Sequence, residues 1–374
     1  MANLGIQRID SLEICVHDAE PWIAYLTSGF GFQPVAVSTE ADVESRGYRR
    51  HLLRCGEIDL VLAESVVLGS RAERLLDRHP EGLSRIGFLV NDLAATEQRL
   101  VERNATPIDF IRSEPIAGGA WKELAIATPL GDVELYFVER PKSNERPGME
   151  PTGQFDASCN PLGLKAIDHL TANTRTLMPT IAFFEHVMGF NRLWDVQFHS
   201  EDVQPGVGTG LKSVVMWDES SGVKIALNEP LRPRFDRSQV QLSIEVHRGA
   251  GIHHLAWEVS DLLAAVDHSR SQGVEFMPTP AAYYEAMPQR IASRKIGPVA
   301  QKIDDLKSRD ILLDGDQNGY LLQAFTKNGG GRFARPKAGP LLIELVQRCG
   351  AAGFGEGNFR ALFDAMQAQR KMDS

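Results

Sequence analysis

The sequence predicts an α+β fold of two similar halves, each a curved mixed sheet of β-α-β-β-β units with helices on its outer face. Three observations lead to this prediction. The 374 residues suffice for two domains of ordinary size. Hydrophobic residues make up 43% and charged residues 24% of the chain, which is typical of globular proteins. Finally, strand and helix patterns repeat along the chain, which indicates duplicated units.

The first repeated segment opens each half. Residues 8–32, "RIDSLEICVHDAEPWIAYLTSGFGF", align without a gap with residues 166–190, "AIDHLTANTRTLMPTIAFFEHVMGF". Each stretch begins with an apolar run typical of a short strand and continues with a helical pattern that ends at Gly-Phe. We therefore expect an equivalent strand and helix at the start of both halves.

Two further segments complete the repeat. Residues 85–93, "RIGFLVNDL", align with 254–262, "HLAWEVSDL", and both precede an apolar helical pattern. Residues 131–140, "GDVELYFVER", align with 339–348, "GPLLIELVQR". The offset grows from 169 to 208 residues between these two pairs, so the second half has 39 more residues before its last strand. This gain contains residues 288–310, whose later part has a helical pattern.

The boundary between the halves is expected near residue 155. Residues 140–161 are rich in Pro, Gly and polar residues, which is typical of a linker. The predicted domains are therefore residues 1–155 and residues 156–374. At the end of the chain, residues 353–369 have the pattern of a Gly-rich turn followed by an amphipathic helix with Asn358 as N-cap. That helix either packs on the core or covers a cavity.

Composition narrows the function classes. The formal charge of −9, without a basic stripe, argues against nucleic acid or an anionic membrane as a partner and favours a small ligand. Neither a signal-peptide pattern nor a run of 18 apolar residues is present, so we expect a cytoplasmic protein. The four cysteines lack CxxC spacing, which is typical of reduced thiols.

Alignment of the halves picks out three positions with metal-ligand chemistry in the second half alone. Two imidazoles and one carboxylate suit non-haem Fe(II), because three ligands on one face leave three coordination positions open. A carboxylate inside "PLLIEL" would be costly to bury without a partner. The aligned pairs are His169 with Ser11, His254 with Arg85, and Glu344 with Tyr136.

The second half resembles the 4-hydroxyphenylpyruvate dioxygenase family of the vicinal oxygen chelate superfamily. The resemblance is carried by "GLKAIDHLTANT", "SQVQLSIEVHRGAGIHHLAW", "ILLDGDQNGYLLQAFTK", "IELVQR" and "GFGEGNFRALF". It covers most of residues 160–370, whereas the first half matches as the degenerate repeat. The resemblance implies two glyoxalase/bleomycin-resistance-like barrels, with a metal in the second and the C-terminal helix over the active site.

The resemblance also implies the site residues. The family's Fe(II) ligands fall on His169, His254 and Glu344, with no further catalytic group. His253, Leu342 and Ala226 stand where the family has Gln, Phe and Pro. Strand alternation predicts that His253 points away from the iron, although the resemblance keeps it near the pocket rim. The substrate-binding positions are Ser213, Asn228, Gln241, His253, Gln323, Phe325, Leu342, Phe354 and Phe359.

The implied activity is an Fe(II)-dependent dioxygenase reaction on a 2-oxo acid. The acid would occupy two open positions on the iron and O₂ the third. Ring hydroxylation of 4-hydroxyphenylpyruvate would give homogentisate, a step of tyrosine catabolism. A homodimer or homotetramer is usual for the family. The residues gained at 288–310, together with 353–369, would exclude water from the site.

Four alternatives stay open on the sequence. Benzylic hydroxylation, as in hydroxymandelate synthase, would need only a different substrate orientation. The three departures from the family pattern allow a different 2-oxo acid. An extradiol catechol dioxygenase uses a similar ligand set and would give a coloured product from a catechol. A non-catalytic, ligand-binding resistance protein shares the fold, but metal ligands confined to one half favour catalysis.

Overall fold

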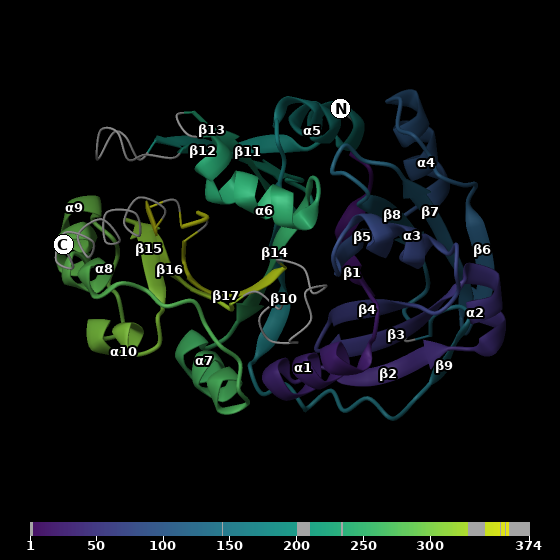
Figure 1. Ribbon diagram of the computed structural model, residues 1–374, viewed down its shortest axis with the longest axis horizontal. Helices are drawn as coiled ribbons and strands as arrows, with labels where there is room; N and C mark the ends of the chain where they lie inside the picture. The colour runs from purple at the N-terminus through teal and green to yellow at the C-terminus, as the bar shows by residue number, and fades with distance from the viewer. Residues whose placement is uncertain are drawn as a thin grey trace.

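Two curled mixed sheets lie side by side in the computed structural model, one from each half of the chain (Figure 1). The structure describes residues 3–143, 145–199, 210–232, 235–327, 341–351, 353–355 and 357–358. Helices pack on the sheets, and the predicted α+β class is confirmed. The chain passes from the first sheet to the second between Pro151 and Leu164.

The first half forms a nine-stranded sheet in the order β6-β7-β8-β5-β1-β4-β3-β2-β9. Its helices α1 and α4 follow β1 and β5, as the repeat predicts. The elements are β1 (Ile6–Val16), α1 (Glu20–Phe30), β2 (Gln33–Ser38), α2 (Glu40–Arg46), β3 (Tyr48–Cys55), β4 (Ile58–Ser65), α3 (Arg71–Arg78), β5 (Gly82–Val90), α4 (Leu93–Glu102), β6 (Arg112–Ile116), β7 (Gly119–Ile126), β8 (Glu134–Glu139) and β9 (Met149–Pro151).

The second half forms an eight-stranded sheet in the order β11-β12-β13-β10-β14-β17-β16-β15. The central strands β10, β14 and β17 correspond to β1, β5 and β8 of the first half. The elements are β10 (Leu164–Asn173), α5 (Met178–Ala182), the π-helical turn η1 (Phe183–Met188), β11 (Asn191–His199), β12 (Gly210–Trp217), β13 (Lys224–Leu231), the 3₁₀ turn η3 (Phe235–Arg237), α6 (Gln239–His247), β14 (Gly251–Val259), α7 (Leu262–Ser271), α8 (Ala281–Glu285), α9 (Met287–Arg294), α10 (Ile303–Lys307), β15 (Leu312–Asp316), β16 (Gly319–Phe325) and β17 (Leu342–Cys349).

The repeat extends to the caps of its helices. Asp92 precedes α4, and its side chain accepts a hydrogen bond from the Ala95 backbone N–H. Asp261 precedes α7 and accepts from Ala264 in the same way. An aspartate at the N-cap satisfies an N–H that the helix itself cannot pair. The repeated Asp-Leu pair therefore starts both helices at the same point after the strand.

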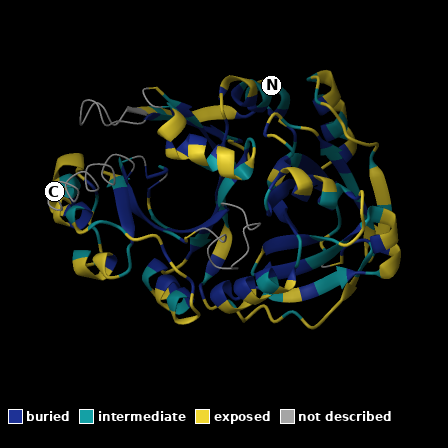
Figure 2. Cartoon of the chain, in the orientation of Figure 1, coloured by how far each residue is buried: buried dark blue, intermediate teal, exposed yellow. Residues whose placement is uncertain are grey.

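Aromatic packing joins the two halves. Trp257 of β14 is fully buried, and its ring centroid lies 5.3 Å from that of Phe30 and 5.1 Å from that of Phe32. Helices α1 and α7 also pack against each other. Figure 2 shows the strands largely buried and the exposed residues mainly on helices and loops. The first half therefore packs against the central strand β14 of the second sheet.

The residues gained before the last strand form more helix than the sequence pattern indicates. The expected later helix is α10, but α8 and α9 precede it. Side chains of α8 and α9 contact β15, and α10 packs against α8 (Figure 1). The predicted C-terminal helix falls largely outside the described residues, which contain a helical start at Gly357 and Asn358. Its position over the site stays a prediction.

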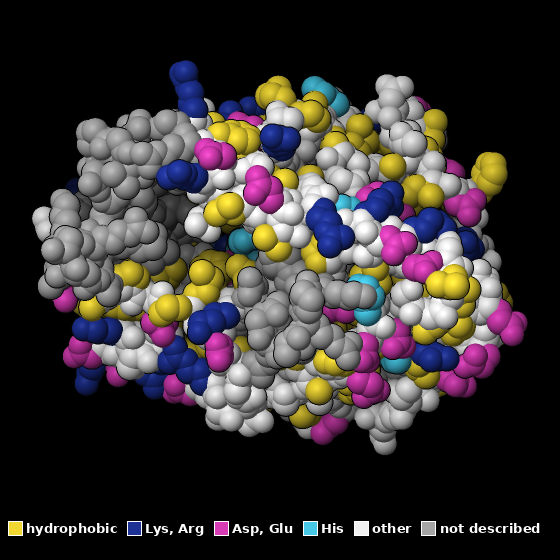
Figure 3. Space-filling model, in the orientation of Figure 1, with side chains coloured by type: hydrophobic (Ala, Val, Ile, Leu, Met, Phe, Trp, Pro, Cys, Tyr) yellow, Lys and Arg dark blue, Asp and Glu magenta, His cyan; other side chains and the backbone are white. Residues whose placement is uncertain are grey.

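One face of the molecule shows how charged side chains are distributed on the surface. On the face shown in Figure 3, acidic and basic side chains of the described residues are interspersed, without a continuous basic stripe. Within the described part of the chain, no helix combines the length and apolar character needed to span a membrane.

Candidate metal centre

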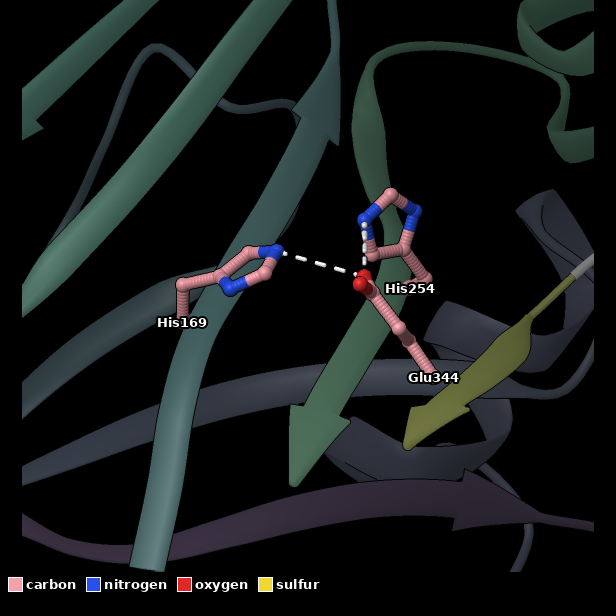
Figure 4. A group of neighbouring side chains, drawn as sticks. All are labelled: His169, His254 and Glu344. Carbon is pink, nitrogen blue, oxygen red and sulfur yellow. Dashed lines mark ion pairs between the residues drawn. The ribbon is translucent and has the colours of Figure 1, made fainter. Parts of the chain in front are cut away.

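Strand register brings the three predicted ligands together. His169 of β10 pairs with Ala256 of β14, and Ala256 pairs with Glu344 of β17. These residues form one row across the sheet, so their side chains share a face. His254 stands two residues before Ala256 and lies on that same face. Figure 4 shows the three side chains converging from their three strands.

The ligand atoms are close enough to share one ion. Nε2 of His169 and Nε2 of His254 each lie 3.3 Å from Oε2 of Glu344. One ligand atom from each residue can be chosen so that all three lie within 4.8 Å of one another. His169 is 3% and Glu344 0% exposed, so the group is removed from solvent.

The hydrogen bonding of the Glu344 carboxylate indicates whether a metal would fit between the three residues. Its Oε1 accepts a hydrogen bond of 2.8 Å from Nε2 of Gln323. Oε2 accepts no hydrogen bond from any described residue, although two imidazole nitrogens face it. A fully buried carboxylate oxygen without a hydrogen bond is costly. A divalent cation between the nitrogens and Oε2 would satisfy it, so the donor set fits Fe(II).

A β-bulge supplies His169 with its supporting partner. Between the pairs Ile167 with Trp257 and His169 with Ala256, β10 contains the extra residue Asp168. A bulge re-aims side chains that would otherwise alternate. Oδ1 of Asp168 accepts a 2.8 Å hydrogen bond from Nδ1 of His169.

The Asp168 carboxylate is itself clamped. Arg348 donates to it through Nε at 2.5 Å and through Nη2 at 2.8 Å. A bidentate guanidinium holds a carboxylate in one orientation. Asp168 therefore fixes the imidazole of His169 with Nε2 toward the metal position, which is how outer partners orient metal-binding histidines.

A second bulge changes the prediction for His253. Thr171 pairs with His254 and Ala172 with Ile252, so His253 is the extra residue of β14. Simple alternation would send His253 away from His254, and that prediction is wrong because the bulge breaks the alternation. The two Nδ1 atoms lie 2.9 Å apart. One proton shared between these two Nδ1 atoms leaves Nε2 of His254 facing the Glu344 carboxylate.

The pKa values describe the protein without metal. Burial lowers the pKa of His253 to about 4. Burial, followed by the charges of His253 and His169, lowers the pKa of His254 well below its usual range. Burial alone would also lower the pKa of His169, but the carboxylates of Glu344 and Asp168 raise it to about 9. The guanidinium of Arg348 and His169 outweigh burial and hold the pKa of Asp168 far below its usual range.

The equivalent row in the first half carries a different set of side chains. Ser11 pairs with Gly87, and Gly87 with Tyr136. The hydroxyls of Ser11 and Tyr136 share a short hydrogen bond. The guanidinium of Arg85 lies over the Tyr136 ring, with its carbon 4.4 Å from the ring centroid. Tyrosine and serine hydroxyls with a fixed cation cannot replace the ligand set of the second half.

Carboxylates around Arg85 compensate its charge. Nitrogens of its guanidinium lie 3.0 Å from Glu123 and 3.0 Å from Glu134. Burial alone would raise the pKa of Glu123, but Arg85 outweighs it and lowers this pKa to about 2.

In the described part of the chain, the group of His169, His254 and Glu344 is the one cluster of three His, Cys, Asp or Glu residues that could hold a metal.

Two of the predicted aromatic residues line the metal group. The ring centroid of Phe354 lies 4.9 Å from that of His169, and that of Phe325 lies 5.6 Å from that of His254, both edge-on. Phe354 belongs to the same hydrophobic cluster as Ala226, one of the departures from the family pattern. Leu342, another departure, pairs with His254 across β14 and β17. Phe359 lies outside the described residues.

The predicted polar pocket residues lie on neighbouring elements. Ser213 and Asn228 pair across β12 and β13, and both are buried. Asn228 donates to Asn173 through Nδ2, whereas its Oδ1 accepts nothing from the described residues. Gln241 of α6 donates to Glu245, and its Oε1 is likewise left without a donor there. Neither amide contacts the metal group by a described hydrogen bond.

Sequence reasoning missed two residues of this centre. Asp168 and Arg348 act on His169, but alternation assigns Asp168 to the opposite face of the strand. The Asp-His pair at positions 168 and 169 could have indicated the contact, because metal-binding histidines commonly donate their other N–H to a carboxylate. Nothing in the sequence pairs Arg348 with Asp168, which stands 180 residues earlier.

Comparisons with known proteins agree with this architecture. The profile of the glyoxalase/bleomycin resistance protein/dioxygenase superfamily matches residues 168–292. The 4-hydroxyphenylpyruvate dioxygenase of Danio rerio is 30% identical over 95% of this chain and 89% of its own length. The enzyme of the same name from Dictyostelium discoideum is 28% identical over 98% of this chain and 99% of its own.

A solved structure shows the same fold. A triple mutant of 4-hydroxymandelate synthase from Streptomyces coelicolor superposes with a TM-score of 0.79 at 25% identity, covering 98% of this chain and 99% of that one. Sequence and fold thus agree over nearly the whole length, which favours an enzyme over the non-catalytic binding protein. The chain belongs to the 4-hydroxyphenylpyruvate dioxygenase family and is a dioxygenase-type enzyme of that family.

Proposed function

We propose that this enzyme is an Fe(II)-dependent 2-oxo acid dioxygenase that converts 4-hydroxyphenylpyruvate, or a closely related aryl 2-oxo acid, by oxidative decarboxylation and hydroxylation. The observation that carries the proposal is the buried Glu344 Oε2, 3.3 Å from two imidazole nitrogens and without a hydrogen bond from the described residues. Residues 156–374 would form the catalytic domain, and residues 1–155 a domain without metal.

In this proposal His169, His254 and Glu344 hold the iron. Fe(II) in such a site supplies open coordination positions for the 2-oxo acid and O₂, and electrons for O₂ reduction. One atom of O₂ enters the new carboxylate and the other a hydroxyl group, while the original carboxylate leaves as CO₂. Because substrate and co-substrate are one molecule, no second organic cofactor is needed.

The chain's own residues would position the substrate and exclude water. The rings of Phe354 and Phe325 stand beside the two histidines and provide an apolar wall. Such a wall limits side reactions of an oxidising intermediate with water. The amide oxygens of Asn228 and Gln241 accept no hydrogen bond from the described residues, and a phenolic hydroxyl could satisfy them. These acceptors favour an aryl acid with a ring hydroxyl.

A benzylic hydroxylation is the second candidate, favoured by the similarity to 4-hydroxymandelate synthase. The two reactions differ in which carbon of the substrate lies nearest the metal. His253, Ala226 and Leu342 stand close to the metal group or under Phe354, where they would influence that orientation.

Aerobic turnover with a panel of aryl and alkyl 2-oxo acids tests the proposal. We expect O₂ uptake and CO₂ release with 4-hydroxyphenylpyruvate after Fe(II) loading. Homogentisate and 4-hydroxymandelate are isomers, so the product must be assigned by chromatography against standards rather than by mass. The Glu344→Ala variant should lose both metal binding and O₂ uptake. Uptake that survives in this variant, or that requires a catechol, would reject the proposal.

A further inference from the structure

A chain of hydrogen bonds, buried as far as Tyr283, leads away from the Glu344 carboxylate. Nε2 of Gln323 donates to Oε1 of Glu344 at 2.8 Å. Oε1 of Gln323 accepts from Nδ2 of Asn358 at 2.7 Å. Oδ1 of Asn358 accepts from the Tyr283 hydroxyl at 2.6 Å, and that hydroxyl accepts from Nη2 of Arg290 at 2.6 Å. All five side chains lie in the second half.

Chemistry fixes the direction of every bond in this chain. The guanidinium of Arg290 can only donate, and the carboxylate of Glu344 can only accept. The Tyr283 oxygen accepts from Arg290 and from the Leu313 backbone N–H. Its single proton faces Oδ1 of Asn358 at 2.6 Å and the Leu313 carbonyl oxygen at 3.1 Å, and that carbonyl already accepts from Arg290, so the proton goes to the nearer Asn358. Each amide then accepts on its oxygen and donates from its nitrogen. Rotating either amide by half a turn would place two donors or two acceptors together.

Three of the five residues of this chain lie outside the strands of the second sheet, whereas Gln323 lies on β16 and Glu344 on β17. Tyr283 lies on α8 and Arg290 on α9, within the residues gained before the last strand, and Asn358 stands in the helical start after β17. A second contact supports the same arrangement, because Asp314 of β15 accepts from the Gly357 N–H and pairs with Arg294 of α9. The gained helices are thus tied to the metal ligand through side chains.

We infer that Tyr283 is a positioning residue for the metal-binding carboxylate: through Asn358 and Gln323 it holds Oε1 of Glu344 and thereby leaves Oε2 toward the two histidines. This inference rests on the proposed metal centre. A carboxylate that is free to rotate would present either oxygen, or both, to the ion. Outer partners of this kind typically change metal affinity by about 10- to 100-fold when removed.

The Tyr283→Phe variant removes the hydroxyl that donates to Asn358. Co(II) serves as the probe, because its visible absorption reports ligand geometry and its affinity can be titrated without O₂ chemistry. We expect Tyr283→Phe to weaken Co(II) binding by about 10-fold and to shift the absorption bands of the bound ion. Tyr284→Phe is the matched control, since Tyr284 is the neighbouring buried tyrosine on α8 and lies outside the chain of hydrogen bonds. It should bind Co(II) as the unaltered protein does.

A second variant separates hydrogen-bond direction from packing. Asn358→Asp keeps the shape but replaces the donor with an acceptor, so the Gln323 amide must turn and direct its oxygen at Glu344. We expect an affinity loss at least as large as that of Tyr283→Phe, measured on protein whose fold is verified by circular dichroism. A packing role would leave Asn358→Asp close to the unaltered protein, which would overturn the inference.

The unaltered protein and Glu344→Ala separate this inference from the proposed function. If the unaltered protein takes up no Co(II), the metal centre itself fails, and the inference with it. If the unaltered protein binds Co(II), Glu344→Ala does not, and both Tyr283→Phe and Asn358→Asp keep full affinity and unchanged spectra, the inference alone is refuted.

Discussion

The Gly87→Ala substitution tests how firmly the first half holds Tyr136 at the position where the second half has the candidate metal ligand Glu344. A Cβ at position 87 would lie 2.6 Å from the Tyr136 hydroxyl oxygen and 2.7 Å from its Cε2, well inside van der Waals contact. Gly87 has no positive φ, so alanine is compatible with its backbone. The effect of the substitution therefore comes from the contact with Tyr136.

The magnitude follows from how firmly Tyr136 is held. Its hydroxyl bonds Ser11, and the guanidinium of Arg85 covers its ring, so the ring cannot move away freely. Overfilling a packed core costs about 1–3 kcal/mol. At about 2–4 °C per kcal/mol for a domain of this size, a cost of about 2 kcal/mol lowers the melting temperature by about 4–8 °C.

Calorimetry on the Gly87→Ala, Tyr136→Leu and double variants measures this coupling. Tyr136→Leu removes the ring that the new methyl group would strike, so the double variant should be more stable than the two single effects predict. Co(II) binding by the folded Gly87→Ala protein should stay unchanged, because the metal group lies in the other sheet. A melting temperature equal to that of the unaltered protein, or purely additive effects, would refute the reasoning.

Three further predictions concern the second half and its contact with the first. His253→Leu should weaken Co(II) binding by about 10-fold in a titration. His253→Gln keeps a hydrogen-bond acceptor for His254 and should retain the Co(II) affinity of the unaltered protein. An equal loss of affinity in both variants would contradict a hydrogen-bonding role of His253. Asn228→Leu should raise KM for 4-hydroxyphenylpyruvate by about 3- to 10-fold but leave KM for phenylpyruvate unchanged in O₂-uptake assays, because only the former offers a hydroxyl; equal changes would remove Asn228 from substrate recognition. Burial, followed by the charge of His79, lowers the pKa of His247 to about 4, so the unfolded chain takes up this proton before the folded protein does as the pH falls. The contribution of neutral His247 to the stability of the fold is therefore complete above about pH 6.5 and is lost toward pH 4. Melting curves of His247→Asn should show a weaker pH dependence over that interval.

The pattern of the repeat was sufficient to predict the fold class and three candidate positions, which the family resemblance then identified as ligands. Aligning "AIDHL", "HHLAW" and "LLIEL" with their counterparts places His169, His254 and Glu344 at matching points of three strands. The structure confirms that β10, β14 and β17 are adjacent and brings the three side chains together. The equivalent strands of the two sheets pair in the same register. Positions that align in the sequence therefore occupy equivalent places in the two sheets.

The immediate surroundings of the ligands were not predictable in the same way. Strand alternation assigned His253 to the wrong side and gave no role to Asp168, because a bulge adds a residue without a clear sequence signal. The chain of hydrogen bonds from Glu344 to Tyr283 was also not predictable, since its contacts join residues that stand as far as 75 positions apart in the sequence, and no pattern links Tyr283 or Asn358 to the predicted ligand Glu344.

The amino-acid sequence by itself determined which half could bind a metal, because ligand chemistry is a property of residue types: imidazole and carboxylate stand in one half, and serine, arginine and tyrosine in the other. Tertiary structure decided which atom of each ligand faces the metal position. Asp168, His253 and Gln323 orient the imidazoles and the carboxylate through hydrogen bonds whose geometry depends on bulges and on helices packed from distant parts of the chain. Hydrogen bonds act over about 3 Å, so their partners are set only once the strands have taken their places.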